Sequence, residues 1–170
     1  MKSLLNFVIF FALIVIHTDV KSQDSYHDSI MENYEERIRL THINGVYIPA
    51  NVDDALAQLD ILIDRSSQVK YKSASEYEAV SKLHFSFGLW MIVNWGFYEG
   101  SRLSHSLKAM GISYPDDMAS TLMICYHRRL NGKPLELEQL ASHFSKIRKE
   151  VFDSRLEKGE VIHKKMVKPR

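Results

Sequence analysis

The sequence is poor in cysteine, has no excess of charge of either sign and contains no low-complexity tract. One cysteine among 170 residues cannot pair within the chain, so a fold held together by disulfide bonds is excluded. With 22 Lys+Arg against 21 Asp+Glu the formal net charge is +1, which argues against a protein that holds nucleic acid by bulk charge. A hydrophobic share of 45% argues against disorder and indicates one globular domain with a real core.

One long apolar run, Phe7–Ile16, follows a basic residue near the start of the chain. Ten helical residues span about 15 Å, half of a hydrocarbon core, so the run predicts a secretory signal rather than a membrane span. Val20 and Ser22 are small enough for the −3 and −1 positions of a cleavage site before Gln23. We therefore expect a signal peptide over residues 1–22. An uncleaved anchor is the alternative.

Cleavage would deliver the protein to the periplasm or the cell exterior with no membrane span left. These compartments are oxidising, and an exposed free thiol is a liability there. Cys125 lies within an apolar helical pattern, so we expect its side chain to be buried.

Apolar spacing and capping residues predict an all-α fold, a single compact array of five or six helices. Residues 23–44 are polar with room for a short helix, residues 45–157 form the helical domain, and residues 158–170 are expected to be a mobile tail. Helices are expected to start at Asn51, Ser75, Ser101 and Pro115 and after Pro134, and the last helix to end near Leu156.

The segment of about residues 76–94 is apolar on all sides. One side carries Val80, Leu83, Phe87, Trp90 and Met91, and the other carries Phe85, Leu89, Ile92 and Val93. A helix that is apolar all round is buried all round, so we expect this helix to be the central element of the array.

The stretch after His84 carries an ordered set of motifs. It reads H-F-x-F-G-x-W from His84, N-W-G-x-x-x-G-S-R-L from Asn94 and G-I-x-x-P-D-D-M from Gly111. Over about residues 45–145 the chain resembles a bacterial family of small, often exported domains of unknown function. The chain departs from that family's pattern at Val93, where the family has a basic residue. The resemblance implies the boundary of the fold and no reaction.

The loop that follows the central helix combines polar groups suited to an anion. Asn94 ends a helix, Trp95 opens the glycine-bounded loop, and Ser101 and Arg102 begin the next helix. Free N–H groups beside a guanidinium bind carboxylate or phosphate, so residues 94–102 are the predicted ligand site. Nearby aromatic residues could form a stacking wall. They are Trp90, Trp95, Phe97 and Tyr98.

A structural interpretation of the same residues stays open. Asn94 would cap the helix, the aromatic residues would fill the core, and Arg102 would pair with Asp116 or Asp117. Those two acids directly follow Pro115, and a helix start favours them on dipole grounds alone.

His84 and His105 are the histidines considered for chemistry. His84 is either a core histidine bonded to a backbone carbonyl or a general base that needs a nucleophile or water nearby. His105 lies one turn from Arg102 and could face the same pocket. His105, His127 and His143 are scattered without an H-x-x-x-H pair or cysteine partners, so neither a metal nor a cofactor is expected.

These patterns favour an exported, non-catalytic binding module for an unknown protein or a small anionic ligand, using the 94–102 loop. The chain carries no catalytic signature that we recognise, and no catalytic residue is assigned. One alternative is an enzyme on an envelope substrate, with His84 or His105 as base and Arg102 holding an anion. Another is an immunity-type protein that blocks a toxin.

Overall fold

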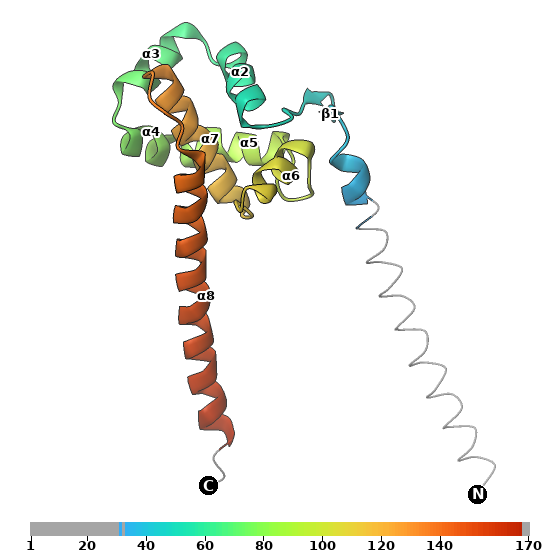
Figure 1. Ribbon diagram of the computed structural model, residues 1–170, viewed down its shortest axis with the longest axis vertical. Coiled ribbons are helices and arrows are strands. Elements are labelled where there is room, and N and C mark those ends of the chain that lie inside the picture. Colours follow the sequence, from blue (N-terminus) through green and yellow to red (C-terminus); the bar gives the residue numbers. More distant parts are fainter. Residues whose placement is uncertain (1–30, 32, 168–170) are drawn as a thin grey trace, which may run out of the picture.

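The structure is a computed structural model that describes residue 31 and residues 33–167. The expected signal peptide, residues 1–22, lies outside the described residues. Figure 1 shows a compact helical body from which one long helix, α8, extends. No helix in the described ranges is both long and apolar enough to span a membrane.

A short hairpin precedes the helical body. Residues 33–37 are helical, and β1 (His42–Ile43) then pairs antiparallel with β2 (Val46–Tyr47). Asn44 and Gly45 connect the strands with φ angles of 50° and 79°, as a tight hairpin turn with two left-handed residues requires. Asn44 and Gly45 therefore close a minor two-stranded sheet.

From Val52 on, the described chain forms seven α-helices and one π-helical turn. They are α2 (Val52–Leu62), α3 (Arg65–Ser73), α4 (Glu76–Leu83), η1 (His84–Gly88), α5 (Leu89–Asn94), α6 (Arg102–Ala109), α7 (Pro115–Leu130) and α8 (Leu137–Val167). The all-α class is confirmed. The count exceeds the expected five or six because α3 was not foreseen and because η1 divides the segment 76–94.

The predicted helix starts coincide with observed caps. The Asn51 side chain accepts from the Asp54 N–H, and Ser75 forms a reciprocal capping box with Glu78. Ser101 caps α6, and Pro115 is the first residue of α7. The three side-chain caps join residues within one turn of each other, which is why sequence spacing finds them.

The centre of the body is α7 rather than the segment 76–94. Helix α7 packs against α2, α3, α4, η1, α5, α6 and α8, and it crosses the middle of the body in Figure 1. Cys125 lies on it and is fully buried, as expected. The expectation that residues 76–94 are buried all round is wrong, because Phe85 is 86%, Leu89 51% and Val93 65% exposed.

The π-helical turn explains part of this one-sided burial. In η1 the Leu89 N–H donates to the His84 carbonyl, five residues back, instead of four. One extra residue per turn rotates the following side chains relative to a regular α-helix. Met91 and Ile92 consequently face the core, whereas Leu89 and Val93 face outward.

Helix α8 leaves the body after its first turns. Leu140 and Ala141 are buried, and α8 packs on α7. Beyond this contact it projects away from the other helices (Figure 1). It runs to Val167, past the predicted end near Leu156, so most of the segment expected to be a mobile tail is helical.

Candidate functional site

The predicted ligand loop is covered by the chain's own N-terminal segment. Tyr34 packs against Gly100, where an added β-carbon would lie 2.4 Å from the ring. The Arg37 Nε donates to the Gly100 carbonyl at 3.0 Å. Gly100 has φ +97°, a conformation that favours glycine, so this close approach is built into the loop.

Tyr34 also contacts His105. Its hydroxyl lies 3.1 Å from the His105 Nδ1, and the Lys108 Nζ lies 4.9 Å from the centre of the Tyr34 ring. Partial burial, with a smaller contribution from the charge of Glu35, raises the pKa of Tyr34. Tyr34 is therefore the neutral phenol at neutral pH, and His105 is an exposed partner of the N-terminal segment.

Arg102 is fixed by the hairpin region. Its Nε donates to the Ile48 carbonyl at 2.6 Å, and its Cζ lies 5.2 Å from the centre of the Tyr47 ring. An Asp54 carboxylate oxygen lies 3.9 Å from its Nη2. Within this part of the chain Arg102 thus acts as a structural cation that ties α6 to β2 and α2.

The expected ion pair between Arg102 and Asp116 or Asp117 is wrong. Arg148 takes this place, with its Nη2 and Nε 2.6 and 2.7 Å from the two carboxylate oxygens of Asp117. The hydrogen bonds to the Asp117 carboxylate, together with its negative charge, raise the pKa of Arg148. Sequence spacing missed the pair because Arg148 is 31 positions away along the chain, on α8.

The other residues of the 94–102 loop serve the fold. Ser101 is fully buried, and its hydroxyl accepts from the Ser104 N–H at 3.2 Å. The Asn94 Nδ2 donates to the Trp90 carbonyl at 2.9 Å, one turn back on its own helix α5. Trp95 is fully buried, and its indole N–H finds no partner among the described residues.

His84 lies apart from that loop and contacts two other polar side chains. Its Nδ1 is 3.4 Å from the Ser120 Oγ, and its Nε2 is 3.5 Å from an Asp116 carboxylate oxygen. A pocket of about 410 Å³ opens beside these groups between α4 and α7. It is lined by Glu76, Tyr77, Val80, Ser81, His84, Ser120 and Ile124. The structure therefore brings His84 to a serine and a carboxylate. His105 instead contacts the N-terminal segment, and Arg102 contacts the hairpin region and α2.

A second pocket, on the other side of α4, is more apolar. It has a volume of about 430 Å³ and lies between α3, α4 and η1. We call it the α3–α4 pocket, and it is lined by Ile63, Ser67, Lys70, Tyr71, Ala74, Glu78, Ala79, Lys82, Leu83 and Phe87. The sequence interpretation missed it because α3, which supplies one wall, was not predicted.

Most polar groups of the α3–α4 pocket are already engaged. The Tyr71 hydroxyl donates to the Met123 carbonyl at 3.0 Å, and the Ser67 hydroxyl donates to Asp64 at 2.6 Å. Burial raises the pKa of Tyr71 well above its usual range, so this phenol stays neutral. These contacts leave a pocket whose open surface is mainly hydrocarbon.

The positive and negative charges that line the same pocket do not balance. Glu78 accepts from Ser75 and from the Lys82 Nζ, the latter at 3.2 Å, and these contacts lower the pKa of Glu78. Lys70 lines the pocket from α3, and within the described ranges it takes part in no ion pair. The pocket therefore offers one uncompensated positive charge.

Metal chemistry has no built site in the described part of the chain. No group of three or more His, Cys, Asp or Glu side chains there could hold a metal ion. His84 and Asp116 form a pair, and Ser120 is the third polar side chain beside them.

The fold and these sites define a small helical domain with two pockets flanking α4. Residues 48–130 match the family model of a domain of unknown function, DUF6794. This match lies inside the range 45–145 over which the sequence resembles a family of unknown function. No curated protein and no solved structure matches the chain.

Proposed function

We propose that this protein is an exported, non-catalytic binding module that takes a ligand with an apolar body into the α3–α4 pocket. The observation that carries the proposal is the pocket itself, about 430 Å³ with mainly hydrocarbon walls. Pockets for small molecules have volumes of about 300–1,000 Å³ and mostly apolar linings with few polar groups. Export rests on the apolar run at the start of the chain.

The α3–α4 pocket is a better ligand site than the 94–102 loop. Tyr34 and Arg37 cover the loop, and Arg102 is bonded to the Ile48 carbonyl. A ligand at the loop would have to displace these contacts and leave buried polar groups without partners, which costs about 1–3 kcal/mol for each. A ligand in the α3–α4 pocket would not have to displace contacts of this kind.

An uncharged apolar fluorophore, 1-N-phenylnaphthylamine, tests this proposal. We expect saturable 1:1 binding to the wild-type protein, because the probe buries its rings against the pocket walls. Leu83→Trp places a larger side chain at the pocket and should weaken binding at least about fivefold. Absence of saturable binding would contradict the proposal.

A matched variant controls for the added indole. Leu89 lies on the adjoining helix, is 51% exposed and does not line the α3–α4 pocket. Leu89→Trp should therefore leave the affinity for the probe unchanged. Equal weakening by both variants would locate the probe elsewhere on the surface.

A hydrolase is the second candidate, and the contact between His84 and Ser120 favours it. In this alternative the Ser120 Oγ attacks the carbonyl carbon of an ester while His84 accepts the hydroxyl proton. The protonated His84 then gives that proton to the departing alcohol, and water releases the acid in a second step. Asp116 would stabilise the charged imidazole from its 3.5 Å position.

A fluorophosphonate probe separates the two candidates. The hydrolase requires a covalent adduct on Ser120, located by peptide mass spectrometry and lost in His84→Ala. Ser81→Ala, which changes another serine of the same pocket, should leave the adduct intact. An unlabelled wild-type protein would remove the hydrolase and leave the binding module. The immunity-type alternative rests on size and export, and no contact described above adds to it.

A further inference from the structure

The α3–α4 pocket combines hydrocarbon walls with an excess of positive charge. Three charged side chains line it, Lys70, Glu78 and Lys82. Glu78 and Lys82 compensate each other at 3.2 Å, one turn apart on α4. Lys70 stands on the opposite wall, on α3, and adds a net charge of +1 to the pocket.

The two features point to one kind of ligand. A wholly apolar molecule would use the walls and gain no attraction from Lys70, whose side chain is exposed and hydrated. A small inorganic anion would use Lys70 and leave the hydrocarbon walls exposed to water. A molecule with an alkyl chain and one anionic group satisfies both, since burial stabilises the chain and Lys70 attracts the head group.

We infer that the α3–α4 pocket binds a free single-chain anionic amphiphile of the fatty-acid type, with its carboxylate beside Lys70 and its alkyl chain against Ile63, Leu83 and Phe87. This inference rests on the proposed function. The volume of about 430 Å³ lies near the lower end of the range of ligand pockets, which suits one chain rather than two.

Displacement of 1-N-phenylnaphthylamine by dodecanoate, decanoate, octanoate and dodecanol tests the chemistry. Each methylene group buried in the pocket should tighten binding about fourfold, so affinity rises from octanoate to dodecanoate. An ion pair of an exposed lysine such as Lys70 is worth about a twofold to fivefold change in affinity. Dodecanoate should therefore displace the probe at a concentration about twofold to fivefold lower than dodecanol at low salt.

Two variants locate the charge. Lys70→Gln should abolish the preference for dodecanoate over dodecanol and leave the affinity for dodecanol unchanged. Lys72→Gln, which removes an exposed lysine of the same helix that does not line the pocket, should keep the preference. Equal binding of dodecanoate and dodecanol, or a preference that survives Lys70→Gln, would overturn this inference while the proposed function stands. Failure of the uncharged fluorophore to bind would overturn the proposed function itself.

Flotation with vesicles distinguishes the free amphiphile from a bilayer. We expect the protein to remain unbound to vesicles of phosphatidylcholine with a third of phosphatidylglycerol, at concentrations where dodecanoate saturates it. Binding to these vesicles that is lost in Lys70→Gln would replace the single-chain ligand by an anionic lipid surface.

Discussion

Tyr34 lies so close to Gly100 that a β-carbon at position 100 would stand 2.4 Å from the nearest ring atom. The contact joins residues 66 positions apart, one before the hairpin and one in the loop between α5 and α6. Arg37 adds its hydrogen bond to the Gly100 carbonyl. The N-terminal segment is consequently part of the folded domain.

Gly100→Ala should destabilise the protein more than Gly111→Ala. Both glycines have positive φ, +97° and +89°, so both substitutions strain the backbone by about 1–3 kcal/mol. A β-carbon at position 111 meets nothing within 4 Å, whereas at position 100 it strikes the Tyr34 ring. We expect an additional cost of about 1–3 kcal/mol for Gly100→Ala, measured by urea unfolding.

The source of that additional cost can be isolated. Tyr34→Ala removes the ring, so the cost of Gly100→Ala should fall to that of Gly111→Ala when it is measured in this background. An unchanged cost would mean that the N-terminal segment is not packed on the loop in solution.

Capping residues and their spacing predicted where the helices begin. The partners of Arg102 and Asp117 lie far away in the sequence and were not predicted. The Ser75 and Glu78 capping box needs two residues one turn apart, so its spacing is visible in the sequence. The partner of Arg102 is a backbone carbonyl, that of Ile48, 54 positions away. Every residue has a backbone carbonyl, so the identity of residue 48 does not reveal that its carbonyl is the partner of Arg102.

The exposed face of the segment 76–94 was also not predicted from the sequence. Apolar residues on all sides predicted burial on all sides, yet Phe85 and Val93 face outward. The π-helical turn after Leu83 changes the rotation of the helix, and its position has no signature that we recognise in the sequence. The α3–α4 pocket was missed for a related reason, since one wall of it comes from a helix of low hydropathy.

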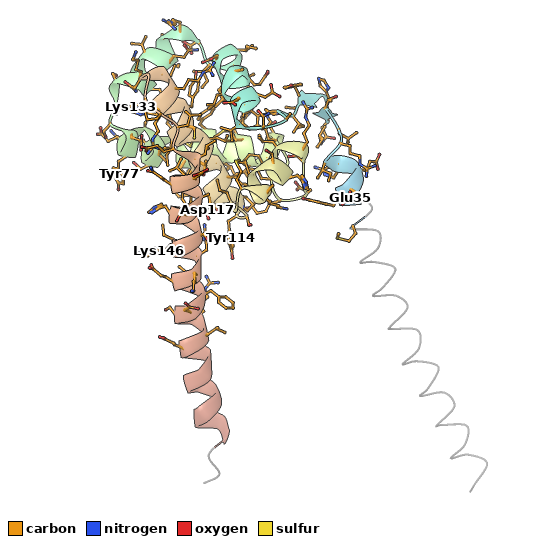
Figure 2. All side chains as sticks on the ribbon, in the orientation of Figure 1. Glu35, Tyr77, Tyr114, Asp117, Lys133 and Lys146 are labelled. Atoms are coloured by element: carbon orange, nitrogen blue, oxygen red, sulfur yellow. The ribbon has the colours of Figure 1, made fainter. Side chains whose placement is uncertain are left out.

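Asp117 and Arg148 should couple strongly in unfolding free energy. The contact is bidentate at 2.6 and 2.7 Å, and the Asp117 side chain is only 9% exposed. Figure 2 shows Asp117 and Tyr114 beside α8 where this helix leaves the body. A double-mutant cycle with Asp117→Ala and Arg148→Ala should give a coupling of about 1–3 kcal/mol.

The corresponding cycle for Arg102 and Asp117 is the control. These residues share no partner in the described part of the chain, so their coupling should stay within about 0.5 kcal/mol. A larger value would restore the ion pair that the sequence suggested. Arg102→Ala alone should still cost about 1–3 kcal/mol through its bond to the Ile48 carbonyl.

Stability should fall at alkaline pH, and Tyr126 should account for part of the loss. Burial, reinforced by the charge of Asp60, raises the pKa of Tyr126 to about 12 from an ordinary value of 10.0. Between these values the folded state keeps a proton that the unfolded state has lost. The contribution of Tyr126 to the free energy of unfolding is therefore complete below pH 10. It is lost as the pH rises through 12, by about 1.4 kcal/mol per pH unit.

Tyr126→Phe gives the comparison. Its phenyl ring keeps the packing and removes the titrating hydroxyl, which donates to the Leu59 carbonyl at 3.4 Å. The unfolding free energy of the variant, from urea titrations between pH 9 and 11.5, should decline less steeply above pH 10. Parallel curves would show that the pKa of Tyr126 is the same in the two states.

Cys125 should react with thiol reagents through unfolding rather than in the folded protein. Its side chain is fully buried on α7, and burial raises the pKa of the thiol to about 12 from 9.0, although Arg128 opposes the shift. At pH 8 about one folded molecule in ten thousand carries the reactive thiolate. Labelling by dithionitrobenzoate should therefore be slow without urea and should accelerate along the unfolding transition.

An exposed thiol supplies the reference rate. Ser142 lies on the exposed side of α8, so Ser142→Cys in a Cys125→Ala background should be labelled within the mixing time of a manual assay. Labelling of wild-type Cys125 at a similar rate would show that α7 opens readily at the centre of the fold. Because α7 packs on most of the other helices, such opening would also disrupt the wall of the α3–α4 pocket that Tyr71 forms through its bond to the Met123 carbonyl. The labelling rate is thus a measure of how well the pocket is preformed, and we expect saturating dodecanoate to lower it in the wild-type protein.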